Sequence, residues 1–301
     1  MKTNDFKNKV ALITGSSIGI GKAIAMELGS HGIKVVINGR QKGKLIEAYE
    51  ELRALDYDVL AIAADIRYAN QCEILIEKTI EKFGRLDIVV NNAAVSSRGS
   101  VEEAAVSNIE VLMDTNFSGS AYISKYAIPH LKKTKGHLIF INSVGGMRGM
   151  PYNMAYTSSK MAQAALAEAL LLELHEDQVH VGIAYVGFTE NDTRKTILDV
   201  DGAWIFLPKR NNIRLMKPAS VAKNVFRMMR KRNFKIILTP LGHFTNLMTR
   251  HFPRFTNWLV HWTSKKIRED FTFLEEERKL NTEYGEIDVQ VPFVILDAIP
   301  D

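Results

Sequence analysis

A tyrosine and a lysine spaced four residues apart, Tyr156 and Lys160, are the residues of this sequence best suited to proton chemistry. The surrounding pattern predicts a helix that runs to about Glu173, so the two side chains share one helical face, with a rise of roughly 6 Å between their Cα atoms. A phenol titrates at a pKa of about 10 in water, and a nearby ammonium group favours the phenolate. The pair therefore predicts a general acid or base, although the same spacing also occurs between ordinary surface neighbours.

Two other polar residues could complete such a site. Ser143 follows the predicted strand 137–142, and ligands of open α/β sheets bind at the carboxyl ends of strands, where a hydroxyl can hold a substrate oxygen. Asn116 falls in a predicted helix, where asparagine is a poor helix former unless it has a polar role. The alternative for Asn116 is a helix kink that is satisfied by water.

A glycine-rich segment near the N-terminus has the composition of a phosphate-binding turn. It reads Thr14-Gly15-Ser16-Ser17-Ile18-Gly19-Ile20-Gly21, follows the first predicted strand and opens the first predicted helix. Glycines let the backbone turn sharply and approach a pyrophosphate, while the N–H groups and the positive end of the helix face the anion. This context favours a nucleotide site over a turn that has no ligand.

The elements that must position these residues are short apolar runs that alternate with amphipathic segments. Near-continuous apolar strands separated by helices are what a parallel sheet covered on both faces requires. The sequence therefore predicts an α/β fold with a doubly wound sheet. The predicted strands are 9–14, 33–38, 58–63, 86–91, 137–142, 180–186 and 234–239.

The composition is that of a globular protein. Of the 301 residues, 46% are hydrophobic and 24% are charged, and no run of about eighteen apolar residues could cross a bilayer. The N-terminus lacks the pattern of a secretory signal, so we expect a cytoplasmic protein.

Cys72 is the only cysteine, which excludes an internal disulfide and favours a buried, inert thiol. The net charge of +5 owes much to basic residues at 227–235, which could attract anionic partners but are more typical of a solvated helix end, so we expect no nucleic-acid partner. We also expect no metal site.

In order and spacing, these motifs resemble those of the short-chain dehydrogenase/reductase (SDR) family over residues 6–240. The family's cofactor turn matches the glycine-rich segment, and its Asn-Asn-Ala-Gly strand end matches Asn91-Asn92-Ala93-Ala94, with alanine in place of the last glycine. The resemblance implies a doubly wound Rossmann fold with a mostly seven-stranded parallel sheet, helices on both faces and a C-terminal helical extension. The family's catalytic Asn, Ser, Tyr and Lys fall on Asn116, Ser143, Tyr156 and Lys160.

For this chain the resemblance implies a nicotinamide-dependent oxidoreductase that acts on a small-molecule carbonyl or alcohol. Tyr156 would donate a proton to the carbonyl oxygen as a hydride arrives from the cofactor, or accept it in the reverse reaction, while Ser143 would hold that oxygen. Lys160 would lower the pKa of Tyr156 and hydrogen-bond the nicotinamide ribose, and Asn116 would hold a water that relays protons to solvent. The alternative is a non-catalytic dinucleotide-binding sensor or scaffold that acts through the C-terminal extension.

The end of the second predicted strand favours NADP(H) over NAD(H). Family members that prefer NAD usually carry an acid at the position of Gly39, whereas Arg40 offers a planar cation that suits a 2′-phosphate. A solvated loop arginine is the alternative. Asp65 and Ile66 match the family's adenine contact, although Asp65 also suits a turn or a helix cap.

Past the sixth predicted strand, Gly187 matches the family pattern, and Thr189 or Thr193 would reach the nicotinamide amide. The stretch 204–207 then lies where family members carry a mobile substrate lid. Its apolar composition indicates an apolar substrate, such as a steroid, fatty acyl, retinoid-like or quinone carbonyl, and packing on the chain's own core is the alternative. The predicted cofactor-binding residues are Gly15, Ser16, Ser17, Ile18, Gly19, Ile20, Gly21, Arg40, Asp65, Ile66, Asn92, Ala93, Tyr156, Lys160, Gly187 and Thr189.

We expect a dinucleotide-binding and catalytic domain over 1–240 and an amphipathic extension with an acidic tail over 241–301. An apolar helical stripe crosses the extension, and Pro253 must kink or divide it. One interpretation is burial against its own domain or against a second subunit of a homodimer or homotetramer. The other is peripheral membrane contact through 244–266, with Arg250, Arg254, Lys265 and Lys266 at the headgroups. The stripe consists of Phe244, Leu247, Met248, His251, Phe252, Phe255, Trp258, Leu259 and Trp262.

Overall fold

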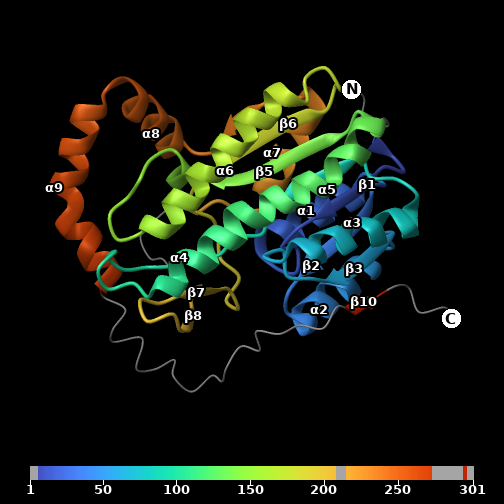
Figure 1. The fold of residues 1–301 in the computed structure, drawn as a ribbon, viewed down its shortest axis with the longest axis horizontal. Helices are drawn as coiled ribbons and strands as arrows, with labels where there is room; N and C mark the ends of the chain where they lie inside the picture. Colours follow the sequence, from blue (N-terminus) through green and yellow to red (C-terminus); the bar gives the residue numbers. More distant parts are fainter. Residues whose placement is uncertain (1–5, 208–214, 273–293, 297–301) are drawn as a thin grey trace.

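An eight-stranded sheet lies at the centre of the computed structural model, which describes residues 6–207, 215–272 and 294–296 (Figure 1). The strand order is β10-β3-β2-β1-β4-β5-β6-β9. Every pairing from β3 to β9 is parallel, and β10 pairs antiparallel with β3. The predicted seven-stranded parallel sheet is therefore confirmed, with one added edge strand. The bounds are β1 (Val10–Ile13), β2 (Lys34–Gly39), β3 (Val59–Ala63), β4 (Ile88–Asn91), β5 (His137–Ser143), β6 (His180–Val186), β9 (Lys235–Ile237) and β10 (Val294–Leu296).

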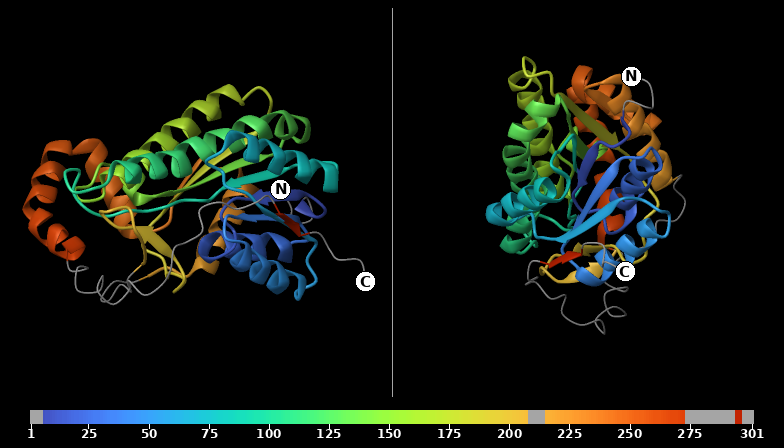
Figure 2. Two further views of the ribbon diagram at one scale, coloured as in Figure 1. Left: turned by 60° about the horizontal axis from the view of Figure 1, so that its bottom comes forward. Right: turned by 90° about the vertical axis from the view of Figure 1, so that its right-hand side faces the viewer.

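Helices cover both faces of this sheet, as Figure 2 shows. In β1, Ala11 and Ile13 pack into one helix layer, whereas Val10 and Leu12 pack into the other. All four side chains are buried, which explains why the strands of this sequence are apolar throughout and do not alternate. One layer consists of α1 (Gly19–Ser30), α2 (Lys42–Arg53) and α7 (Pro218–Lys231), and the other of α3 (Ala69–Phe83), α5 (Gly119–Thr134) and α6 (Met154–Glu173).

The direction of the strand order changes between β1 and β4. In a doubly wound sheet this switch opens a crevice at the carboxyl ends of the strands, where ligands bind. The glycine-rich turn follows β1, Asn92 follows β4, Ser143 ends β5 and Gly187 follows β6. The topology therefore brings four separate candidate segments to one edge of the sheet.

A π-helical turn, Asp114–Ser118, separates α4 (Val106–Met113) from α5. Asn116 lies in this turn and is fully buried. A π-turn interrupts the regular α-helical hydrogen bonds and is frequent at functional sites. The helix expected around Asn116 is thus present, but it widens at this residue.

Two helices form an arm at the end of the molecule where α6 begins, α8 (Pro240–His251) and α9 (Pro253–Thr272) (Figures 1 and 2). Phe252, with φ −129° and ψ 55°, breaks the helix before Pro253, which divides the stripe as expected. The residues of the apolar stripe are exposed, except for Met248 and Leu259, which are half-buried. The interpretation that the stripe is buried against the described part of its own domain is therefore wrong. None of the described helices is both long and apolar enough to span a membrane.

The C-terminal part of the chain also contributes to the sheet. β10 lies within the segment 241–301, and its three residues pair with Ala61, Ile62 and Ala63 of β3. The division of the chain near residue 240 therefore stays a prediction. Arg250, Arg254 and Lys265 lie on the arm, whereas the side chain of Lys266 is outside the described residues.

Candidate active site

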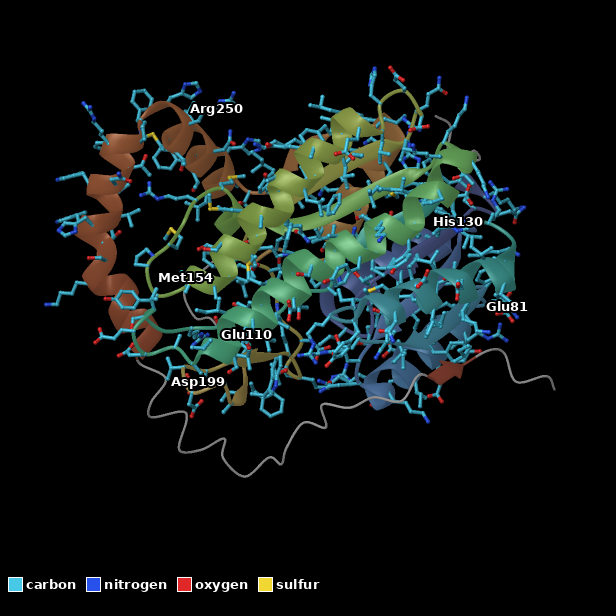
Figure 3. All side chains as sticks on the ribbon, in the orientation of Figure 1. Glu81, Glu110, His130, Met154, Asp199 and Arg250 are labelled. Carbon is cyan, nitrogen blue, oxygen red and sulfur yellow. The ribbon has the colours of Figure 1, made fainter. Side chains whose placement is uncertain are left out.

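A cleft of about 1700 Å³ opens at the carboxyl ends of the central strands. Met154, which is labelled in Figure 3, begins α6 at this end of the molecule, and Tyr156 follows it within one helical turn. Ser16 and Asn116 do not line the cleft. The predicted site residues that do are Gly15, Ser17, Ile18, Gly19, Ile20, Gly21, Arg40, Asp65, Ile66, Asn92, Ala93, Ser143, Tyr156, Lys160, Gly187 and Thr189.

The glycine-rich turn has the backbone shape that a dinucleotide needs. Gly15 and Gly19 have φ values of 61° and 60°, in the left-handed region that side chains disfavour. A Cβ atom on Gly15 would lie 2.7 Å from the Cα of Ala93, so this position also requires a close backbone approach. The first turn of α1 contains no acidic residue, and Ile20 and Gly21 line the cleft. The turn and the positive end of α1 therefore fit a pyrophosphate.

The side chains of Ser16 and Thr14 hold this turn in place. The Ser16 hydroxyl accepts a hydrogen bond from the Asn38 backbone N–H at 2.9 Å, and Ser16 is fully buried. The Thr14 hydroxyl accepts hydrogen bonds from the backbone N–H groups of Asn92 and Ala93 at 3.0 and 3.1 Å. The side chain of Ser16 thus tethers the turn to β2, whereas Asn92 and Ala93 both support the turn and line the cleft.

Arg40 lies at the end of the cleft that is expected to hold the adenosine. Its guanidinium carbon lies 5.1 Å from the centre of the Trp204 ring, and its nearest nitrogen is 4.0 Å from the Asp65 carboxylate. Asp65 is already paired with Arg67 at 2.7 Å, which offsets the carboxylate charge. Burial lowers the pKa of Arg40, but a guanidinium stays charged in proteins. Gly39 has no side chain, and a Cβ atom there would lie 2.9 Å from the Ser17 hydroxyl oxygen. No acidic residue therefore stands directly before Arg40 in the sequence.

Lys160 is the most unusual ionisable group of the cleft, because its side chain is only 2% exposed. The ammonium donates hydrogen bonds to the Ile141 carbonyl at 2.9 Å and to the Gln163 side-chain carbonyl at 3.2 Å. Burial, and secondly the positive charge of Lys195, lower the pKa of Lys160 to about 7. The group therefore changes charge near neutral pH.

Ser143 and Tyr156 both lie close to Gly145. A Cβ atom built on Gly145 would lie 3.5 Å from the Ser143 hydroxyl oxygen and 3.5 Å from the Tyr156 ring. The Ser143 hydroxyl accepts a hydrogen bond from the Gly145 N–H at 3.1 Å, which leaves its proton for another acceptor. The two hydroxyl-bearing side chains therefore approach the same small volume of the cleft.

Gln163 connects Lys160 to Asn116, and the motifs of the sequence did not identify it. Its side-chain carbonyl accepts from Lys160 at 3.2 Å and from Asn142 at 3.1 Å. Its amide donates to the Asn116 carbonyl at 3.1 Å and to the Ser120 hydroxyl at 2.8 Å. Gln163 is fully buried, so all four hydrogen-bonding positions are satisfied without solvent. The available signal was a polar residue three positions after Lys160 on an otherwise apolar helical face.

Asn116 acts as a junction between helices in this structure. Its side-chain amide donates to the Val95 carbonyl and to the Ser159 hydroxyl, both at 2.9 Å, and its side-chain oxygen accepts from the Val95 N–H at 2.8 Å. Its backbone carbonyl accepts from Gln163 and Ser120. Asn116 therefore reaches Lys160 through Gln163.

Apolar side chains also line the cleft. The stretch expected to form a lid includes β8 (Trp204–Phe206), which pairs antiparallel with β7 (Thr196–Leu198). Thr189 lines the cleft, whereas Thr193 is exposed and does not. No group of three or more potential metal ligands occurs among the described residues. The large apolar lining residues are Met150, Phe188, Trp204, Leu207, Leu215 and Leu241.

Residues 9–201 match the family model of short chain dehydrogenases. An 11-beta-hydroxysteroid dehydrogenase-like protein, 4A, of Arabidopsis thaliana is 37% identical over 61% of this chain, and the chain spans 62% of that relative. The 3-dehydrosphinganine reductase of Danio rerio is 32% identical over 79% of this chain and 73% of its own length.

Solved structures show the same fold. A short-chain dehydrogenase/reductase from Burkholderia phymatum, in complex with NAD, has a TM-score of 0.72 at 22% identity and covers 83% of this chain and 96% of its own. An alcohol dehydrogenase from Thermococcus sibiricus, complexed with 5-hydroxy-NADP, has a TM-score of 0.68 at 26% identity. It covers 77% of this chain and 96% of its own. Because the family model also matches more than half of the residues, the chain belongs to the short-chain dehydrogenase/reductase family.

Proposed function

We propose that this chain is an oxidoreductase that transfers a hydride between NADP(H) and an apolar carbonyl or alcohol. The observation that carries the proposal is the approach of Ser143 and Tyr156 to one volume of a cleft that the buried Lys160 also lines and that continues to the glycine-rich turn. The bound nicotinamide supplies or accepts the hydride. The chain binds and orients both molecules and moves the proton.

The proton passes through the hydroxyl of Tyr156. In the reductive direction Tyr156 donates it to the carbonyl oxygen, and Ser143 donates a second hydrogen bond to the same oxygen, which stabilises the negative charge that develops there. When Lys160 is charged, it favours the phenolate that remains. A Lys160 pKa of about 7 places this charge change in the range where proton exchange is useful.

We assign Asn116 and Gln163 to positioning. Gln163 accepts from the Lys160 ammonium and is itself fixed by the Asn116 carbonyl, so the two residues set where the ammonium points. Asn116 also holds Ser159, which is the residue before Lys160 on α6. The proton-relaying water that the family resemblance implies at Asn116 stays a prediction, and the described contacts of Asn116 support the positioning role.

The preference for NADP(H) rests on Arg40. Arg67 already pairs with Asp65, and no acid occupies the position of Gly39, so Arg40 can pair with a 2′-phosphate. Family members of known structure include complexes named for NAD and for NADP. Separate titrations of this protein with NADPH and NADH test the preference.

An apolar substrate fits the apolar lining, and two relatives are named for such molecules, a hydroxysteroid and 3-dehydrosphinganine. Purified protein should oxidise NADPH only when a carbonyl compound is added, and a panel of carbonyls of increasing chain length ranks the candidates. If no carbonyl in the panel supports oxidation although NADPH binds, the chain is a dinucleotide-binding sensor or scaffold. The exposed arm is the observation that favours this second function.

We also propose that the protein works in the cytoplasm as a homodimer or homotetramer. Leu172 and Met161 are exposed on α6, and Val106 is exposed on α4, which offers apolar contact area on the helices next to the site. Light scattering of the purified protein measures the mass directly. A monomer at micromolar concentration would contradict this assembly.

A further inference from the structure

Exposed apolar side chains are concentrated on the arm. Seven of the fifteen large apolar side chains that are exposed among the described residues lie between residues 241 and 262. Trp258 and Trp262 stack at 6.2 Å, and Phe255 lies 5.6 Å from Trp258, so the aromatic rings form one row along α9. Monomeric soluble proteins seldom expose such a contiguous patch without a partner. The arm face consists of Leu241, Phe244, Leu247, Phe252, Phe255, Trp258 and Trp262.

The charge of the arm indicates which partner this is. Residues 240–265 include Arg250, Arg254 and Lys265 and contain no aspartate or glutamate. All three cations are exposed, and Arg250 lies near the bend between α8 and α9 (Figure 3). A second copy that packed symmetrically on this face would bring like charges together. An anionic lipid surface offers the complementary charge, and indole rings prefer the membrane–water interface.

The arm is also joined to the cleft. Leu241 of the arm face is 56% exposed and also lines the cleft, as does Thr245 of α8. Arg148, which lines the cleft from the loop between β5 and α6, donates a hydrogen bond of 2.6 Å to Asn257 of α9. A surface that holds the arm face is therefore in contact with the rim of the substrate cleft.

We propose that the arm face docks onto an anionic bilayer, and that the carbonyl substrate is dissolved in this bilayer and enters the cleft past Leu241. The docking is independent of the chemistry, whereas the route of the substrate rests on the proposed function. The aromatic row would lie at the level of the headgroups and acyl chains, with the three cations at the phosphates.

Vesicle sedimentation of the full-length protein tests the docking. The protein should sediment with vesicles of phosphatidylcholine that contain about 30% phosphatidylserine, and far less of it should sediment with vesicles of pure phosphatidylcholine. The double variant Trp258→Ala, Trp262→Ala and the triple variant Arg250→Glu, Arg254→Glu, Lys265→Glu should each bind at least about tenfold more weakly. Leu55→Ala removes an apolar residue that is 47% exposed just after α2, away from the arm, the cleft and the proposed subunit contact, and is the matched control, with unchanged binding expected.

Three results would overturn the docking. One is equal sedimentation of the wild type with anionic and neutral vesicles, and another is equal binding by the wild type and the double variant. The third is light scattering that shows an oligomer for the wild type and half its mass for the double variant, because the arm face would then be a contact between subunits.

Turnover separates the docking from the reaction. With a water-soluble carbonyl the double variant should keep the wild-type rate, and with a long-chain ketone in anionic vesicles it should lose most of its rate. Equal rates on the vesicle-borne ketone would overturn the route through the arm. If neither carbonyl supports NADPH oxidation by the wild type while the vesicles still sediment it, the proposed function fails and the docking stands.

Discussion

Two helices of twenty residues each, α6 and α9, place polar and apolar residues in opposite ways. α6 buries Lys160 and Gln163, which are ordinarily surface residues, and pairs them with other buried groups. α9 exposes Trp258 and Trp262, which are ordinarily interior residues. Buried polar groups must be satisfied and exposed apolar patches must be covered, so each departure indicates a function, one in chemistry and the other in attachment.

The largest expected effect separates function from stability at Lys160. Lys160→Met should reduce turnover by about 10²-fold or more and weaken NADPH binding, because the ammonium and its ribose contact are lost. The same change should stabilise the protein by on the order of 1 to 4 kcal/mol, since a buried charge is replaced by an apolar chain. Urea denaturation at pH 6.5 measures the gain in free energy of unfolding.

The pH dependence of stability sharpens this prediction. Lys160 has a pKa of about 7 in the folded chain and an ordinary value of 10.5, so between these values the unfolded chain binds more protons. Below pH 7 both states carry the proton and the full cost of the buried charge is present. The advantage of Lys160→Met over the wild type should therefore shrink as pH rises from 7 to 10, and a constant difference would contradict the buried charge.

Arg40→Ala is expected to have the next largest effect. Loss of a charged contact to the 2′-phosphate should raise the Kd for NADPH by about 10- to 100-fold, whereas the Kd for NADH should change less than about threefold because NADH lacks that phosphate. Arg53→Ala, at an exposed position of α2 outside the cleft, is the matched control. Equal losses for the two cofactors would remove Arg40 as the basis of the preference.

Gln163 variants should have a smaller but more specific effect. Gln163→Leu removes the acceptor of Lys160 and should lower turnover by about tenfold and lower the apparent pKa of the reductive pH profile. Gln163→Glu places a carboxylate at the same distance and should raise that pKa. A purely structural role would lower activity in both variants without moving the pKa in opposite directions, so coincident pH profiles would contradict the positioning role.

The smallest effect is the pH profile of the wild type. Carbonyl reduction needs a protonated Tyr156 that is made acidic by charged Lys160, so kcat/KM should fall several-fold as pH rises through about 7. Oxidation of the matching alcohol should rise over the same range, because it needs the Tyr156 phenolate, which forms when the coupled pair of Tyr156 and Lys160 has lost one of its two protons. Stopped-flow rates in both directions between pH 5.5 and 9 check this, and two flat profiles would exclude Lys160 as the titrating group.

Much of the fold follows from local patterns in the sequence. Seven parallel strands were predictable because each is a continuous apolar run, and the seventh is shorter than expected because Thr239 caps α8, where its hydroxyl accepts from the Gly242 N–H. β10 has only three residues and depends on its pairing with β3, so no local pattern marks it. The buried, inert Cys72 was correctly predicted, since burial raises its pKa to about 12.

The site was predictable where a residue type has a single strong chemical use. Tyr156, Lys160 and the glycine-rich turn carry their chemistry within a few neighbouring residues. Gln163 was missed because its role depends on contacts with Asn116, which is distant along the chain, and with Lys160 at once. The position of Ser16 beneath the turn also depends on a distant strand, through its hydrogen bond with Asn38.

The central claim is that Tyr156 moves the substrate proton, and Tyr156→Phe tests it most directly. The variant lacks only the hydroxyl, so NADPH should bind with the wild-type Kd within about twofold. Carbonyl-dependent NADPH oxidation should fall by at least about 10²-fold at pH 7. Binding and turnover are measured on the same preparation by fluorescence titration and absorbance at the reduced nicotinamide band. Turnover within a few-fold of the wild type would contradict the account.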